Sequence, residues 1–166
     1  RIVHRRFYMR LAAVLAFGIF LVPGFNARTQ AQVHDVKSET RVVLDAYAHQ
    51  DAKTVLAVIG DQTVMYGADS SEIFRGVAQI QTMLSNDARL WSGTAHIGEM
   101  QNVTVVNHGN LESIFFQAPF TVGNRPPVPV RFCMIWKHSG KHWLLLQSSN
   151  AVVTEHQSAA ELLGAH

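Results

Sequence analysis

Four titratable side chains could act as the proton acceptor of an acid–base site: Asp69, Glu72, Glu112 and His96. A general base has to be a titratable group inside a pocket. Asp69 and Glu72 follow a short strand-like run, which would place them at a pocket mouth, and Asp69 is the candidate catalytic residue. The alternative is structural: Asp69 would hold the turn through its own backbone, and Glu72 would pair with Arg75.

The nine histidines show no spacing typical of metal ligands. Neither His-x-His nor His-Glu-x-x-His occurs, and His138 and His142 are expected on opposite faces of a hairpin. The sequence also contains no glycine-rich phosphate loop and no nucleophile elbow, so we expect neither metal nor cofactor. The single cysteine, Cys133, cannot form an internal disulfide and is predicted to be a buried, inert thiol.

Aromatic and hydrogen-bonding residues of the expected helices and strands could line an internal pocket. Such a lining suits a small apolar ligand with one or two polar atoms. The alternative is a filled core without a cavity, because aromatic stripes often serve packing alone. The residues expected to line the pocket are Tyr47, Tyr66, Trp91, Phe116, Phe132, Met134, Gln147 and Ser149.

Residues 1–31 have the pattern of a signal peptide. Four arginines precede an apolar run from Leu11 to Val22, and Thr29-Gln30-Ala31 offers small residues to a signal peptidase. The run is shorter than the ~20 apolar residues of a membrane-spanning helix. The alternatives are an uncleaved anchor or a buried helix. We expect cleavage near Ala31, a periplasmic or secreted location, and one domain over residues 32–166.

Removal of this segment would change the charge of the chain. It holds five of the 14 basic residues and none of the 12 acidic ones. The remaining nine basic and 12 acidic residues give a formal charge of −3. A mildly acidic domain without a basic cluster binds nucleic acid poorly, so we expect no nucleic-acid partner and no membrane association after cleavage.

The rest of the chain predicts three helices followed by an antiparallel meander. Asp35 and Asp51 are expected N-caps for the first two helices, and Gly76 opens the third, which is expected to stop at Ser85-Asn86. Thr154 and Gln157 resemble a capping box for a short terminal helix. The expected helices span 36–50, 52–59 and 76–86, and the main expected strands span 63–67, 90–106, 111–122, 128–138 and 141–153.

The last hairpin is expected to turn at Ser139-Gly140. This register puts Phe132 opposite Gln147 on one face and places Cys133 and Ile135 opposite Leu146 and Leu144 on the other. Both faces of the hairpin would then be apolar, whereas an antiparallel sheet commonly has one wet face. We therefore expect the helices to cover one face and a second copy of the chain to cover the other, giving a homodimer.

The order of elements and three short segments resemble the nuclear transport factor 2-like superfamily, and most closely its SnoaL-like branch (polyketide cyclase and ketosteroid isomerase-like proteins). The segments are residues 51–59, 65–76 and 140–146. The resemblance implies an α+β fold. A cone-shaped, curved, mixed or antiparallel sheet would wrap around three N-terminal helices and enclose an internal pocket.

The resemblance also implies positions for proton-transfer residues, and this chain departs from them. The aspartate base of ketosteroid isomerases aligns with Gly67, their oxyanion tyrosine aligns near Val43, and a histidine common in the SnoaL-like branch aligns with Ser149. These departures favour an exported domain that binds a small apolar molecule or acts as a dimeric interaction module. The alternative is a SnoaL-like lyase or isomerase that moves a proton on a cyclic apolar substrate.

Overall fold

The computed structural model describes residues 35–154 and 157–164, and the expected signal peptide lies outside them. No helix among these described residues is long and apolar enough to cross a membrane. The elements in chain order are α1 (Val36–Ala48), α2 (Ala52–Leu56), β1 (Ile59–Tyr66), β2 (Ile73–Arg75), α3 (Gly76–Trp91), β3 (Ala95–Ile97), β4 (Gln101–His108), β5 (Leu111–Val122), β6 (Val128–Ser139), β7 (His142–Val152) and α4 (Ala159–Leu162).

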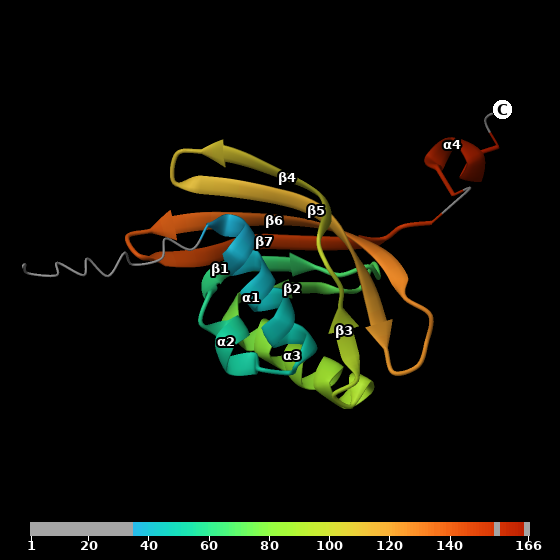
Figure 1. The fold of residues 1–166 in the computed structure, drawn as a ribbon, viewed down its shortest axis with the longest axis horizontal. Coiled ribbons are helices and arrows are strands. Elements are labelled where there is room, and N and C mark those ends of the chain that lie inside the picture. Colours follow the sequence, from blue (N-terminus) through green and yellow to red (C-terminus); the bar gives the residue numbers. More distant parts are fainter. Residues whose placement is uncertain (1–34, 155–156, 165–166) are drawn as a thin grey trace, which may run out of the picture. The chain divides into compact units, whose positions relative to one another are not determined.

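A curved, unclosed mixed sheet is packed against α1, α2 and α3 (Figure 1). Its strand order is β2-β1-β7-β6-β5-β3, and β4 pairs with β5 outside this path. The β1–β7 pair is parallel, and the other pairs are antiparallel. The expected α+β architecture, a curved mixed sheet wrapped on three helices, is confirmed.

The first two helices begin at the expected N-caps. The Ser38 backbone N–H donates to Asp35 Oδ1 at 2.7 Å, and the Thr54 N–H donates to Asp51 Oδ1 at 3.1 Å. A side-chain oxygen at this position satisfies a backbone donor that the first turn of a helix leaves unpaired. Both cap predictions are therefore confirmed.

Helix α3 is longer than the sequence analysis predicted. It continues past Ser85 and Asn86 and ends at Trp91, where Ser92 adopts a left-handed conformation with φ 47°. Ser85 and Asn86 are both exposed, so their side chains do not interrupt the packing of the helix. The prediction of a strand beginning at residue 90 was wrong, and the extra turns bring Asp87 and Trp91 onto the inner side of the helix.

The β6–β7 hairpin has a different register from the expected one. The turn lies at Gly140-Lys141, where Gly140 has φ +64°, and Ser139 pairs with His142. A β-bulge at Leu146 then shifts the pairing, because Trp136 pairs with Leu145 but Ile135 pairs with Gln147. An extra residue on one strand reverses the faces of all residues that follow it.

The bulge decides which side chains of β7 face the helices. Ser148 is buried and, with Asn150, lines the space between sheet and helices. Gln147 and Ser149, expected in the pocket, instead pair with Ile135 and Cys133 on the outer face. The prediction that these two residues line the pocket is corrected by this shift.

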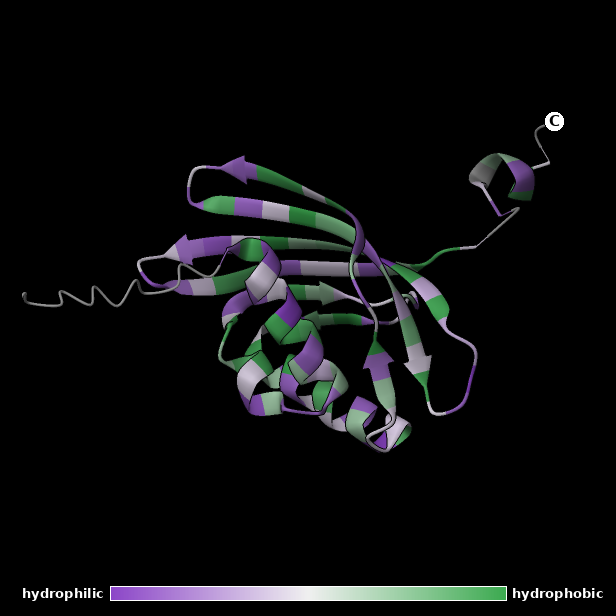
Figure 2. Cartoon of the chain, in the orientation of Figure 1, coloured by the Kyte–Doolittle hydropathy of each residue, from purple (hydrophilic) through white to green (hydrophobic). Residues whose placement is uncertain are grey.

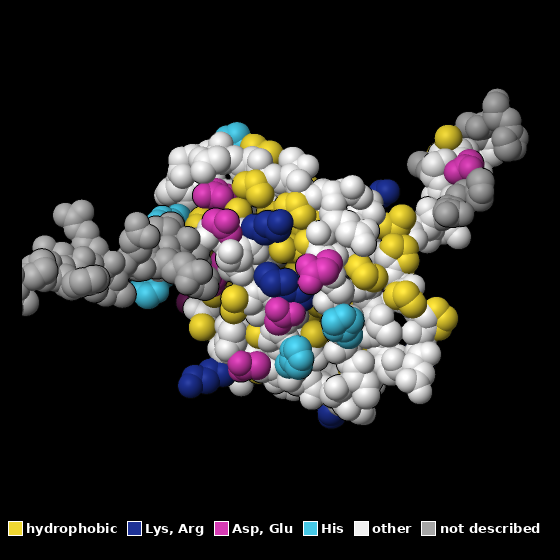
Figure 3. Space-filling model, viewed as in Figure 1, with side chains coloured by type: hydrophobic (Ala, Val, Ile, Leu, Met, Phe, Trp, Pro, Cys, Tyr) yellow, Lys and Arg dark blue, Asp and Glu magenta, His cyan; other side chains and the backbone are white. Residues whose placement is uncertain are grey.

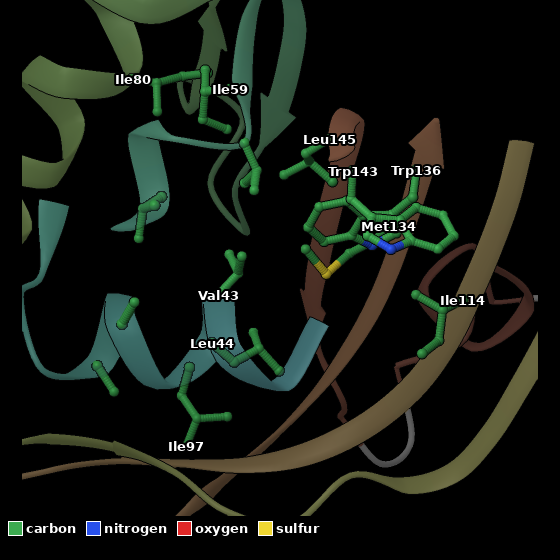
Figure 4. Packing of buried hydrophobic residues seen from close by; sticks show 14 of the residues in the cluster. Val43, Leu44, Ile59, Ile80, Ile97, Ile114, Met134, Trp136, Trp143 and Leu145 are labelled. Carbon is green, nitrogen blue, oxygen red and sulfur yellow. The ribbon is translucent and has the colours of Figure 1, made fainter. Parts of the chain in front are cut away.

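Large side chains fill the region between the sheet and α1. Trp136 and Ile114 are fully buried, Leu145 is 1% exposed, and Trp143 packs beside Trp136 (Figure 4). Burial alternates along the middle of β5 and β6, as expected of strands with one buried face. Hydropathy does not alternate as strictly (Figure 2), because Phe115 and Ile135 are apolar residues of the outer face. The inner face of the sheet therefore forms the hydrophobic core with the helices.

The outer face of the sheet is more polar than the sequence analysis predicted. Cys133 and Ile135 lie opposite Ser149 and Gln147, so Leu146 and Leu144 are not their partners. Cys133 is half-buried, and its burial raises the pKa of the thiol. An apolar patch remains on β4, β5 and β6, which we call the outer patch: Val106, Phe115, Cys133 and Ile135.

The terminal helix α4 has a different cap from the expected one. Ser158 Oγ accepts from the Glu161 N–H at 3.2 Å, and Glu161 Oε2 accepts from the Ser158 N–H at 2.9 Å. This reciprocal pair is a capping box. The box was expected at Thr154 and Gln157, and it lies four residues further along the chain.

Candidate functional site

A cavity of about 270 Å³ lies between the inner face of the sheet and α1, α2 and α3. Most of its lining is apolar and comes from elements that are far apart in the sequence. Val43 and Met134, two of the lining residues, are drawn with their neighbours in Figure 4. The apolar lining includes Val43, Met65, Phe74, Met83, Phe132 and Met134.

A hydrogen-bonded pair, Tyr47 on α1 and Asp87 on α3, provides the main polar group of the cavity. Tyr47 Oη donates to Asp87 Oδ2 at 2.7 Å. The indole of Trp91 contacts the Tyr47 ring edge-on at 5.0 Å between centroids, and it contacts Phe120 at 5.2 Å. One wall of the cavity therefore combines a carboxylate, a phenol and aromatic rings.

Burial shifts the pKa of both members of the Tyr47–Asp87 pair. Burial raises the pKa of Tyr47 well above its ordinary value, and the negative charge of Asp87 raises it further. Burial also raises the pKa of Asp87, the hydrogen bond from Tyr47 lowers it, and the charge of Glu72 raises it. Tyr47 is thus held as a protonated donor, while the carboxylate of Asp87 binds a proton more readily than an exposed one.

Glu72 brings a second carboxylate to the cavity, from the segment between β1 and β2. Its side chain covers Gly67, since a Cβ built on Gly67 would lie 2.0 Å from Glu72 Oε2. The Asp69 backbone N–H donates to the same oxygen at 3.1 Å. Gly67 therefore leaves the space in which the Glu72 carboxylate lies, at the position where the family resemblance implies an aspartate.

Asp69, the candidate catalytic residue of the sequence analysis, is an exposed turn residue and does not line the cavity. Its Oδ1 accepts from the Ser71 N–H at 2.8 Å and from Ser71 Oγ at 2.6 Å. These hydrogen bonds hold the pKa of Asp69 below its ordinary value. Asp69 therefore has the structural role that the sequence analysis gave as the alternative to catalysis. Its short polar side chain stabilises the turn.

Five of the eight residues expected in the pocket line this cavity: Tyr47, Tyr66, Trp91, Phe132 and Met134. Phe116 is buried outside the lining, where its ring stacks on Phe132 at 4.9 Å. The other titratable candidates, Glu112 and His96, do not line the cavity.

Sequence analysis missed Asp87, Ser148 and Asn150. Asp87 follows Ile80 and Met83 at helical spacing and precedes Trp91 by four residues, so a longer helix would have placed it on the inner side. Ser148 and Asn150 carried no such signal, because their direction depends on the bulge at Leu146.

The charged residues of the cavity wall are acidic. Glu72 and Asp87 are its only residues with a full charge, and none of the described lining residues is Lys, Arg or His. Among the residues that the structure describes, no group of three His, Cys, Asp or Glu side chains could hold a metal ion. On the surface face drawn in Figure 3, by contrast, basic and acidic side chains lie next to one another.

No protein-family model and no curated protein matches this sequence. Solved structures do match in fold. A nuclear transport factor 2-like protein of unknown function from Pseudomonas putida is 14% identical with a TM-score of 0.65, over 74% of this chain and 87% of that one. A protein from Streptomyces avermitilis with a provisional dehydratase name is 13% identical with a TM-score of 0.63, over 74% and 96%.

A third similar structure, from Parabacteroides distasonis, carries a provisional ketosteroid isomerase name. It is 10% identical with a TM-score of 0.60, over 74% of this chain and 92% of that one. Further matches are described as proteins with a cystatin-like fold. The chain thus has the nuclear transport factor 2-like cone fold, which by itself hosts many unrelated functions.

Proposed function

We propose that this chain, a domain of the nuclear transport factor 2-like fold, binds a small, largely apolar molecule in its internal cavity. The observation that supports this proposal is the cavity itself: an apolar space of about 270 Å³ with a few polar groups on its wall. Ligand pockets typically have ~300–1,000 Å³ and this kind of lining. The ligand is therefore small, and its polar atom faces the Tyr47–Asp87 pair.

A larger side chain at Val130 should abolish ligand binding. Val130 is 7% exposed and lines the cavity, so Val130→Phe would fill part of the empty space. Val128 lies two residues earlier on β6, is 40% exposed and does not line the cavity, so Val128→Phe is the matched control. Titration with the neutral probe cyclohexylmethanol, followed by the NMR signal of the Trp91 indole N–H, measures binding.

We expect the probe to shift the Trp91 signal in the wild type and in Val128→Phe, and to leave it unshifted in Val130→Phe. The Trp136 signal serves as an internal reference, because that residue is buried away from the cavity lining. Equal binding by both variants would place the ligand elsewhere, and this would contradict the proposal.

Proton transfer on a bound cyclic substrate is the second candidate function. It is favoured by one observation: the half-buried Asp87, whose pKa is raised by burial, accepts a hydrogen bond from Tyr47 inside the cavity. A carboxylate with a raised pKa beside a protonated phenol provides a base and a hydrogen-bond donor. In this candidate Asp87 takes the role that the sequence analysis gave to Asp69.

We also propose that the chain forms a homodimer through the outer patch. Phe115 is 42% exposed in this patch, and exposed apolar patches often mark interaction sites. Phe115→Glu should convert a dimer into a monomer in sedimentation at micromolar concentration. Val105, 44% exposed on the other face of β4, is the control, and Val105→Glu should remain dimeric. A monomeric wild type would contradict the proposal.

Export is the remaining part of the proposed function. The basic and apolar segments within residues 1–31 support cleavage near Ala31 and a periplasmic or secreted location. The domain that we describe would then meet its ligand outside the cytoplasm.

A further inference from the structure

The two carboxylates of the cavity lie close enough to affect the same groups. The charge of Glu72 raises the pKa of Asp87 and also that of Tyr47. No Lys, Arg or His among the described lining residues balances these charges. The cavity wall therefore carries negative charge within a mostly apolar lining.

The hydrogen bonds at this wall leave one oxygen of each carboxylate available. Asp87 Oδ2 accepts from Tyr47, and Glu72 Oε2 accepts from the Asp69 N–H. Among the described residues, Asp87 Oδ1 and Glu72 Oε1 accept no hydrogen bond. Both residues line the cavity, so a ligand group that donates hydrogen bonds could bind their carboxylates, whereas a ligand that only accepts hydrogen bonds could not use them.

The aromatic rings beside Asp87 favour the same kind of ligand. Trp91 contacts Tyr47 at 5.0 Å and Phe120 at 5.2 Å, and all three rings line the cavity. A cation is attracted to the faces of such rings, most strongly to tryptophan, and more strongly where water is excluded. Aromatic rings and carboxylates at one wall, in an apolar space, suit an ammonium group on a hydrocarbon body.

We infer that the cavity selects a small hydrophobic amine, whose protonated nitrogen faces Asp87 and Glu72 and whose apolar body fills the rest of the space. This inference rests on the proposed ligand-binding function and adds the chemical class of the ligand. The ammonium group donates to the free carboxylate oxygens and reduces the repulsion between the two acids. An anionic ligand of the same shape is repelled.

Three probes of nearly the same shape test this inference: cyclohexylmethylamine, cyclohexylmethanol and cyclohexanecarboxylate, which are cationic, neutral and anionic at pH 7. Each is titrated into the full chain and followed by the Trp91 indole signal. We expect the amine to bind about tenfold or more tightly than the alcohol, as a charge-assisted hydrogen bond would provide. We expect no measurable binding of the carboxylate.

Variants of the two acids identify the groups responsible. Asp87→Asn and Glu72→Gln should each weaken amine binding about tenfold and should weaken alcohol binding much less, because a neutral hydroxyl gains less from a carboxylate charge than an ammonium group does. Asp61→Asn, an exposed acid on β1 outside the cavity, is the matched control and should change neither. Because Glu72 lies at the end of a turn, Glu72→Gln provides the test if Asp87→Asn does not fold.

The outcomes separate the inference from the proposed function. If the alcohol binds as tightly as the amine, or if neither acid variant weakens amine binding, the amine inference is overturned and cavity binding stands. If Asp61→Asn weakens the amine as much as the acid variants do, the attraction is a general surface effect, and the inference fails. If none of the three probes shifts the Trp91 signal, the proposed function fails as well.

Discussion

Replacement of Trp136 by alanine should lower the free energy of unfolding by about 3–5 kcal/mol, which is the usual cost of removing a large buried ring. Trp136 is fully buried on β6 and packs beside Trp143 and Met134 (Figure 4). Its Nε1–H has no hydrogen-bond partner among the described residues. Trp136→Phe removes this unsatisfied donor along with some volume, so it should cost much less than the alanine variant.

Urea unfolding followed by circular dichroism measures these losses, and Trp91 provides the control. Trp91 is partly exposed and lines existing empty space, so Trp91→Ala enlarges a cavity without removing a closely packed ring. We expect its cost to be well below that of Trp136→Ala. Equal losses at the two positions would mean that the space beside Trp91 is filled in solution, and this would contradict the cavity.

The second large effect is expected at Thr63, where Thr63→Val should cost about 3 kcal/mol of unfolding free energy. The Thr63 hydroxyl donates to the Leu145 carbonyl at 2.6 Å and accepts from the Gly60 N–H at 2.9 Å, and the residue is 1% exposed. Valine has nearly the same shape but leaves both backbone groups without this partner. Each unsatisfied buried polar group costs about 1–3 kcal/mol.

This hydroxyl joins β1 to β7 where their register shifts, between Ile59 and Val64. Its loss should therefore also weaken probe binding, because β1 carries Met65 and Tyr66 to the cavity. Thr82→Val on α3 is the control, since Thr82 is exposed and its hydroxyl donates only to the Ala78 carbonyl of its own helix. If Thr63→Val lowered the free energy of unfolding no more than Thr82→Val does, this account would be contradicted.

Local signals in the sequence were sufficient for the helix starts, whereas the fold class followed from the order of elements and from the resemblance of three segments to a known superfamily. Asp35 and Asp51 cap their helices through contacts within three residues, so neighbouring residues contain all the information. The sequence did not distinguish the inner face of β6, because the consecutive apolar residues from Phe132 to Trp136 occupy both faces of the strand. Three of the residues expected in the pocket, Tyr47, Phe132 and Met134, do line the cavity.

The features that decide the chemistry of the site depend on tertiary contacts. Ser85 and Asn86 are weak helix formers, and packing of the residues around them, including Leu84 and Trp91, carries α3 through this point. Asp69 and Glu72 are both acidic and three residues apart, yet Glu72 faces the cavity because Gly67 leaves room for its side chain. Sequence spacing alone could not choose between these two acids.

The bulge in β7 has a consequence for the comparison of this chain with others of its fold. One residue, Leu146, determines that Ser148 and Asn150 rather than Gln147 and Ser149 belong to the cavity wall. A related chain that lacks the bulge would need a one-residue gap here in any alignment. Without that gap, the alignment would match inner positions with outer ones and would transfer a ligand-contacting role to the wrong residues. Gain or loss of a single codon near Leu146 is thus a short evolutionary route by which this fold could acquire or lose a bulge at the cavity wall.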